Sequence, residues 1–209
     1  MPDGSKKRVV VSRSVSRSTI PWVLVGAWAA ASTLLGPAPA RASPQEATLK
    51  AKILLVALAY DRNLKARVGN SVTVGVAYRT DNQASTKAKA EMIQAFEALG
   101  TQTFLGLPLQ IAELPIDNQE NASGLVQQRG IDIIFISDNI GDKLDILLRL
   151  SHEEKTATMT TNADYVQRGV ALGVVLQGAT PRLLVNLPAS KAAGLNLSAE
   201  LMRIAKVIR

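Results

Sequence analysis

Few residues of this chain have the types and spacing that catalysis requires. The single histidine, His152, stands among charged residues after an expected helix, where a histidine is most often a solvated surface residue. The sequence contains no cysteine, so zinc sites of the usual Cys/His composition cannot be assembled. A Ser-His-Asp set would have to use His152, and no Gly-x-Ser-x-Gly turn is present to expose its serine.

A pair of carboxylates is the remaining route to acid–base chemistry. Asp132 and Asp138 flank an apolar stretch expected to form a strand, but Asp138 has a simpler role as a helix N-cap. The glycine motifs of nucleotide-binding loops are absent, and Gly173 and Gly178 suit close packing and a turn in an expected hairpin. The sequence therefore predicts a protein that is not an enzyme, with no catalytic, cofactor-binding or metal-binding residues.

The first 42 residues have the parts of a cleavable secretion signal. Basic residues precede an apolar run over 20–36, and Ala40-x-Ala42 supplies a small-residue cleavage site before Ser43. The alternative is an uncleaved anchor, but a run of 17 residues is at the short end of what crosses a bilayer. We therefore expect a signal peptide over 1–42 cleaved after Ala42, a flexible lead over 43–48, a domain over 49–209, and a periplasmic location.

The basic charge of the chain belongs mostly to that signal. Of the 24 basic and 17 acidic residues, six bases and one acid lie in 1–42, so the remainder has 18 bases, 16 acids and a net charge of +2. Both tryptophans also precede residue 43. Nucleic-acid binding requires a basic face with stacking aromatic side chains, and residues 43–209 do not supply one.

Hydrophobic periodicity predicts helices alternating with strands. We expect helices over 49–67, 85–99, about 122–129, from Asp138 or Asn139 onward, near Tyr165, and from Ser198 to the end of the chain. We expect strands over 71–78, 105–114, 131–136 and 156–160, and a hairpin pairing 170–176 with 182–187. The last helix should bury Leu201, Ile204, Ala205 and Ile208. This order predicts one α/β domain with a mostly parallel mixed sheet flanked by helices, a C-terminal β-hairpin and a closing helix.

The C-terminal third resembles the YfiR/HmsC-like periplasmic family. The similarity runs from Tyr165-Val166-Gln167-Arg168-Gly169 through the hairpin to Asn186-Leu187, then Gly194-Leu195-Asn196-Leu197-Ser198 and a Leu-x-x-Ile-Ala helix at 201–205. The chain departs from the family by having Val170 in place of a second glycine, and Tyr60-Asp61-Arg62-Asn63 where members often have Trp-Pro. It also lacks cysteine, so the disulfide-based redox sensing proposed for some members cannot operate here.

The resemblance implies a periplasmic repressor that binds the periplasmic part of an inner-membrane diguanylate cyclase or sensor protein, thereby lowering cyclic di-GMP and biofilm formation. It implies no nucleic-acid partner and leaves homodimerisation and a small-molecule ligand open. We expect the contact at an apolar patch near the sheet edge or on 105–114, because edge strands offer unpaired backbone groups. The alternative is a small solute-binding protein of a transport system, using a crevice at the carboxyl ends of the strands.

Overall fold

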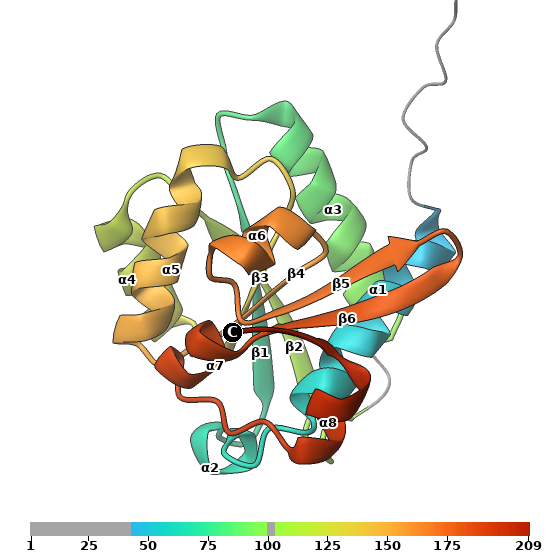
Figure 1. Ribbon diagram of the computed structural model, residues 1–209. Coiled ribbons are helices and arrows are strands. Elements are labelled where there is room, and N and C mark those ends of the chain that lie inside the picture. The colour runs from blue at the N-terminus through green and yellow to red at the C-terminus, as the bar shows by residue number, and fades with distance from the viewer. Residues whose placement is uncertain (1–42, 100–102) are drawn as a thin grey trace, which may run out of the picture. The chain divides into compact units, whose positions relative to one another are not determined.

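The computed structural model describes residues 43–99 and 103–209. The predicted signal peptide over 1–42 lies outside the described residues. The fold is mixed α/β, with one seven-stranded sheet in the order β2-β1-β3-β4-β5-β6-β7 (Figure 1). Strands β1 to β5 run parallel, β6 is antiparallel to β5, and β7 is parallel to β6. The strands are β1 (Val72–Tyr78), β2 (Leu109–Pro115), β3 (Ile133–Ile136), β4 (Ala157–Thr160), β5 (Leu172–Gln177), β6 (Thr180–Asn186) and β7 (Lys206–Ile208).

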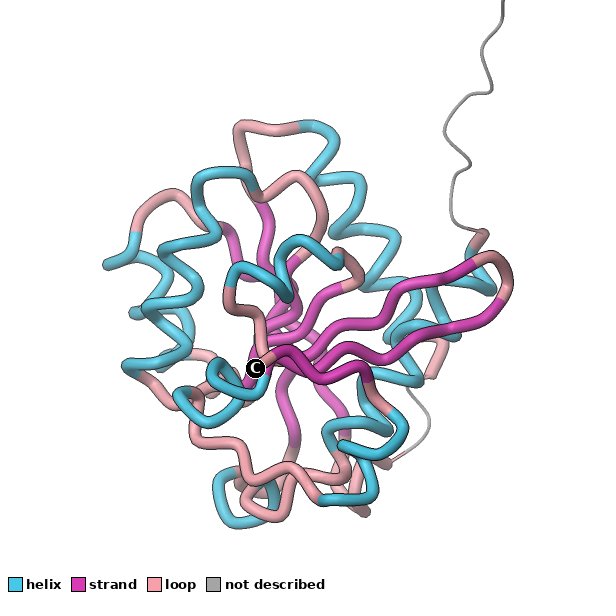
Figure 2. Tube along the Cα trace, in the orientation of Figure 1, coloured by secondary structure: helices cyan, strands magenta, loops and turns pink. Residues whose placement is uncertain are grey.

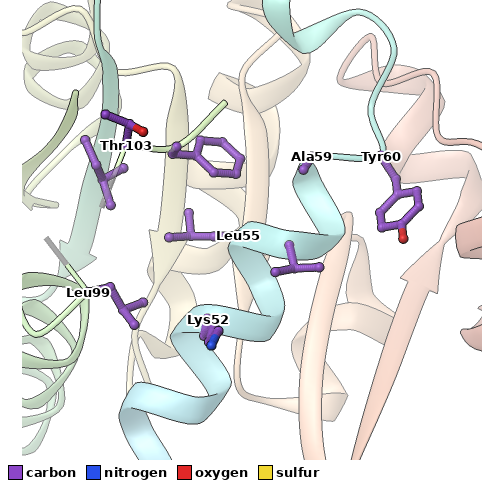
Figure 3. Close-up of a pocket in the computed structure, with 9 residues that line it drawn as sticks. Lys52, Leu55, Ala59, Tyr60, Leu99 and Thr103 are labelled. Carbon is purple, nitrogen blue, oxygen red and sulfur yellow. The ribbon is translucent and has the colours of Figure 1, made fainter. Parts of the chain in front are cut away.

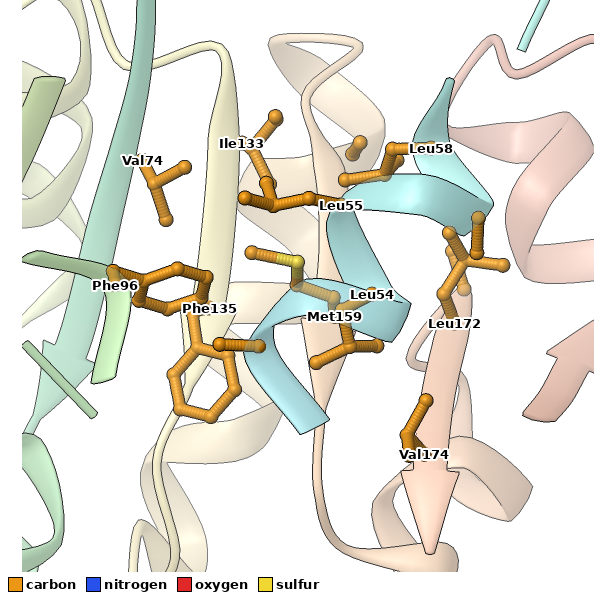
Figure 4. Close-up of a cluster of buried hydrophobic side chains, with 14 of the residues drawn as sticks. Leu54, Leu55, Leu58, Val74, Phe96, Ile133, Phe135, Met159, Leu172 and Val174 are labelled. Atoms are coloured by element: carbon orange, nitrogen blue, oxygen red, sulfur yellow. The ribbon is translucent and has the colours of Figure 1, made fainter. Parts of the chain in front are cut away.

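Helices cover both faces of the sheet, as Figures 1 and 2 show. The helices are α1 (Pro44–Leu58), α2 (Leu64–Arg67), α3 (Gln83–Glu97), α4 (Gln119–Gln128), a 3-10 turn η1 (Gly141–Lys143), α5 (Leu144–Glu153), α6 (Ala163–Arg168), α7 (Leu187–Ala192) and α8 (Ala199–Ile204). α1 and α3 contribute to one apolar core, and α4 and α5 contribute to another. In the first core the rings of Phe96 and Phe135 meet edge to face with centroids 5.6 Å apart (Figure 4).

The strand order reverses direction between β1 and β3. The chain passes from β1 through α3 to the edge strand β2, then through α4 to β3 on the other side of β1. Loops that leave two such strands diverge to opposite sides and open a crevice at the carboxyl ends. The fold therefore places one crevice at this switch point.

Two predictions about the N-terminal region are wrong. Residues 44–48 are not a flexible lead, because α1 begins at Pro44. The Ser43 side chain accepts a hydrogen bond from the N–H of Glu46, and proline suits the first helical position, so the local sequence supports a helix start here. The expected helix over 49–67 is also divided, because α1 ends at Leu58 and only α2 follows. The buried carboxylate of Asp61 causes the break, since it accepts hydrogen bonds from the N–H groups of Asn63 and Asn196.

The closing helix is shorter than predicted. Ser198 caps α8 as expected, but the helix ends at Ile204 and the chain then forms β7 beside β6. Strand β7 satisfies the outer backbone edge of β6, which a helix could not do. The expected buried stripe is therefore correct for Leu201, which is 1% exposed, and wrong for Ile204, which is 73% exposed. Ala205 is half-buried against the core, and Ile208 is half-buried in β7 rather than in the helix.

Candidate functional site

The two carboxylates that flank the central strand do not form a pair. Asp132 precedes β3 and Asp138 follows it, so six residues of extended chain place them about 20 Å apart. Asp132 Oδ2 accepts a hydrogen bond from the N–H of Thr73 at 2.9 Å. Burial raises the pKa of the Asp132 carboxyl, while that hydrogen bond and the charge of Arg67 oppose the rise. This carboxylate therefore has a structural partner in β1.

Asp138 does not cap a helix, contrary to the preferred prediction. Its Oδ1 accepts a hydrogen bond from the Asn162 side chain at 3.0 Å. The following residue, Asn139, has a left-handed backbone (φ 63°), and the chain enters the 3-10 turn η1 before α5 begins. His152 lies exposed in the last turn of α5, as the sequence predicted. Within 43–99 and 103–209, no group of three His, Asp or Glu side chains has the geometry to hold a metal ion.

A polar crevice opens at the carboxyl ends of β1, β3 and β4. It is lined by Arg79, Asn82, Asp138, Asn139, Gly141, Asn162 and Tyr165. The Arg79 guanidinium forms ion pairs of 2.8 Å with Asp81 and Asp142, and its hydrogen bonds lower the pKa of the Asp81 carboxyl. Tyr165 Oη accepts a hydrogen bond from the N–H of Ile140 at 3.2 Å. Many of the polar groups here thus bind one another and join the loops around the switch point.

A second feature is the outward face of α1, which is largely apolar. Leu49, Val56 and Tyr60 are 43%, 51% and 40% exposed. The inward face is apolar as well, since Ala51, Leu54, Leu55 and Leu58 are buried in the core (Figure 4). A helix at the surface of a globular protein ordinarily has a polar outer face. An exposed apolar stripe of this kind is a candidate interaction surface.

A hollow of about 410 Å³ adjoins this face of α1 (Figure 3). Its described lining residues are Lys52, Leu55, Val56, Ala59, Tyr60, Leu99, Thr103, Phe104 and Leu109. A second hollow continues along α1 toward its start and is lined by Pro44, Gln45, Thr48, Leu49 and Lys52. Because Lys52 lines both, we call the two together the α1 groove. Lys52 is the one charged residue among the described lining residues.

The α1 groove partly matches the expected contact region. Leu109 lies at the start of the edge strand β2 and within the segment 105–114 where a contact was predicted, and Phe104 directly precedes that segment. The part supplied by α1 was not predicted, although the sequence of α1 carries a signal for it. The helix has apolar residues on all sides, which is the pattern of a helix covered on both faces.

Comparisons with solved structures show a likeness of fold. A Streptococcus pneumonia structure described as an ABC domain in complex with L-Trp has a TM-score of 0.51 and 14% identity, covering 78% of this chain and 62% of its own. A ligand-free substrate-binding protein with adhesive properties from Clostridium difficile has a TM-score of 0.50 and 14% identity, covering 70% and 57%. The chain thus spans about three fifths of these structures, and the likeness is one of fold.

The sequence comparison identifies the family. No curated protein sequence matches the chain. None of the helices in 43–99 and 103–209 is long and apolar enough to cross a membrane. Residues 48–206 match the YfiR/HmsC-like family, which suggests a periplasmic regulatory protein associated with diguanylate cyclases. Since the match covers most of the sequence, this chain belongs to the YfiR/HmsC-like family.

Proposed function

We propose that the protein is exported to the periplasm, where it binds the periplasmic part of an inner-membrane diguanylate cyclase and holds that enzyme inactive. The result is a lower level of cyclic di-GMP and less biofilm. Family membership supports the class of partner. The observation that carries the proposal is the exposed apolar face of α1, with Leu49, Val56 and Tyr60 beside the α1 groove.

The physical means is a shift between two states of the cyclase. A protein that binds the inactive form better than the active form moves the equilibrium by the difference between the two binding free energies. A near-complete switch requires about 5.5 kcal/mol of such preference. Burying three large apolar side chains contributes about 1.5–3 kcal/mol each when burial is complete. Leu49, Val56 and Tyr60 are already about half buried, so covering them contributes roughly half of that range, and other contacts with the partner supply the rest of the preference.

Deletion of the gene tests the proposal. Cyclic di-GMP and surface attachment should rise in the deletion strain, and a plasmid copy should restore the wild-type level. A copy lacking residues 1–42 should fail to restore it, because its product stays out of the periplasm. Unchanged cyclic di-GMP in the deletion strain would refute the regulatory role.

A point variant tests the surface. Val56→Asp should fail to complement, because a carboxylate in the apolar face opposes docking. Ile204→Asp is the matched control, since Ile204 is also apolar and exposed but lies on α8, outside the α1 groove. It should complement fully. Equal complementation by both variants would remove the α1 face from the interface.

A second candidate is a small solute-binding protein, and the polar crevice at the β1/β3 switch point favours it. Two observations oppose it. The chain matches only about three fifths of the length of the structures it resembles. The Arg79 guanidinium in the crevice is also already paired with Asp81 and Asp142. Calorimetric titration of the purified protein with amino acids and sugars would detect such a ligand, and Asn162→Ala should abolish its binding.

A further inference from the structure

We infer that the α1 groove receives a single amphipathic helix of the partner, which carries apolar side chains and a carboxylate that pairs with Lys52. This inference rests on the proposed function, because it specifies the chemistry of the protein that is bound. Its evidence is the spacing, the charge and the symmetry of the exposed face of α1.

The spacing points to a helical occupant. Exposed residues recur along α1 at Gln45, Leu49, Lys52 and Val56, and at Ala59, which caps its end, in steps of four, three, four and three. A stripe that repeats every 3.5 residues runs nearly straight along a helix, and a second helix meets it along its whole length. The two hollows of the groove likewise follow α1 from Pro44 to Tyr60. Two helices packed side by side bury such a stripe over its full length, whereas a compact loop would cover only part of it.

The charge points to an acidic residue in that helix. Lys52 lies where the two hollows meet, and within the described residues no carboxylate pairs with it. The neighbouring Lys50 differs, because its Nζ lies 2.6 Å from Glu46 Oε1. A helix docked in the groove would cover the Lys52 ammonium, and a covered charge is costly unless an opposite charge compensates it. The occupant must therefore supply a carboxylate.

The symmetry of the face argues against a second copy of this chain. The exposed stripe extends from Gln45 to Tyr60, so Lys52 stands at its centre. Two copies that paired these faces antiparallel would place the two-fold axis near Lys52, because the same patch is used on both sides. The two ammonium groups would then face each other, and like charges in contact are repulsive. An unlike, acidic helix satisfies the same groove without this repulsion.

Binding of purified proteins tests the charge. The probe is the purified periplasmic domain of the membrane diguanylate cyclase whose output rises when this gene is deleted. Lys52→Glu should weaken binding by about tenfold or more, because it opposes two carboxylates. Arg149→Glu makes the same charge change at an exposed position of α5, on the opposite face of the sheet from α1. This variant should leave the affinity within about twofold of wild type. A Glu→Lys or Asp→Lys change in one partner helix should restore binding to Lys52→Glu.

The absence of cysteine allows a test of the helical geometry. Val56→Cys provides a single thiol in the groove, and cysteines placed one at a time along the partner should form disulfides with it under mild oxidation. Crosslinking that peaks every three or four partner residues supports a helix. A period of two, or efficient crosslinking between two copies of Val56→Cys, would overturn the inference.

The outcomes separate the two proposals. If the cyclase domain does not bind the wild-type protein, the proposed function fails. If it binds wild type, Lys52→Glu and Arg149→Glu equally well, the regulatory function stands and the helix-docking inference is wrong. Circular dichroism of each variant, expected to match that of the wild type, shows that altered binding is not a loss of folding.

Discussion

The carboxylate of Asp61 and the guanidinium of Arg67 form an ion pair of 2.7 Å that joins the turn after α1 to α2. The Asp61 side chain is fully buried, and Arg67 is 25% exposed. Asp61 also accepts a hydrogen bond from the N–H of Asn196 at 2.7 Å, and Arg67 donates to the carbonyl oxygens of Lys155 and Ala193. These contacts hold the turn directly after Tyr60, and with it one end of the α1 groove.

Replacing Asp61 by alanine should destabilise the protein by about 2–4 kcal/mol, because buried donors and the Arg67 charge lose their acceptor. Urea unfolding followed by circular dichroism measures the change. Asp145→Ala is the matched control, since Asp145 pairs with Arg168 on the surface at 3.2 Å and is 73% exposed. Asp145→Ala should lower the free energy of unfolding by less than about 1 kcal/mol. Equal costs for the two variants would contradict the structural role of Asp61.

Gly173 packs too closely against α6 to carry a side chain. A Cβ atom at this position would lie 2.3 Å from Val166 Cγ2. Gly173→Ala should therefore destabilise the protein by about 1–3 kcal/mol, as overpacking of a core does. Adding Val166→Ala removes the clashing methyl group, so the double variant should lose less stability than the sum of the single variants. Strict additivity in urea unfolding would show that the contact is not formed.

Two neighbouring apolar residues of α8 should respond differently to truncation. Leu201→Ala removes a side chain that is 1% exposed and should cost about 2–4 kcal/mol. Ile204→Ala changes a residue that is 73% exposed and should alter stability by less than about 0.5 kcal/mol. Thermal unfolding of both variants distinguishes the short helix from the longer buried one that the sequence predicted. A large loss at Ile204 would favour the longer helix.

Ionisation of Asp132 should lower the free energy of unfolding as the pH rises. Burial raises the pKa of its carboxyl above the ordinary 3.8, so the folded state binds this proton more tightly than the unfolded state does. Stability is then lost as the pH rises from about 3.8 through the raised pKa. Asp132→Asn keeps an oxygen for the N–H of Thr73 without the charge. Its stability relative to wild type should therefore increase over this pH interval and change little below it. A difference that stays constant from low to neutral pH would contradict this.

Export should leave Ser43 as the first residue. The basic, apolar and Ala40-x-Ala42 segments predict cleavage after Ala42. The N-terminus produced in this way coincides with the residue whose side chain caps α1. Edman sequencing of the periplasmic protein should begin Ser-Pro-Gln, and the product should show no tryptophan fluorescence, because Trp22 and Trp28 are removed. An intact Met1 in the membrane fraction would indicate an anchor instead.

Local patterns in the sequence predicted most of the sheet correctly. The β-branched run at 71–78 became β1, the apolar run at 131–136 contains β3, and the two strands around Gly178 pair as the expected hairpin. Runs of this kind determine a strand because their side chains suit a pleated surface that is buried on one or both faces. The resemblance at 165–205 also identified the family correctly.

The sequence by itself determined that apolar residues of the first helix extend beyond a single face and that 43–209 alternates strands with helices, because composition and periodicity are local properties. Only the tertiary structure decided where the helices end. Asp61 interrupts the first helix through contacts with Asn196, 135 residues away, and β7 replaces the end of the last helix because β6 offers an open edge. Only the fold, likewise, decided which side of α1 is exposed. Leu54 and Leu58 are buried in the core, which leaves Leu49, Lys52 and Val56 facing outward. Lys52 and Val56 line a hollow together with Phe104 and Leu109. A groove built from segments about 50 residues apart has no local pattern, because it exists only once those segments are packed together.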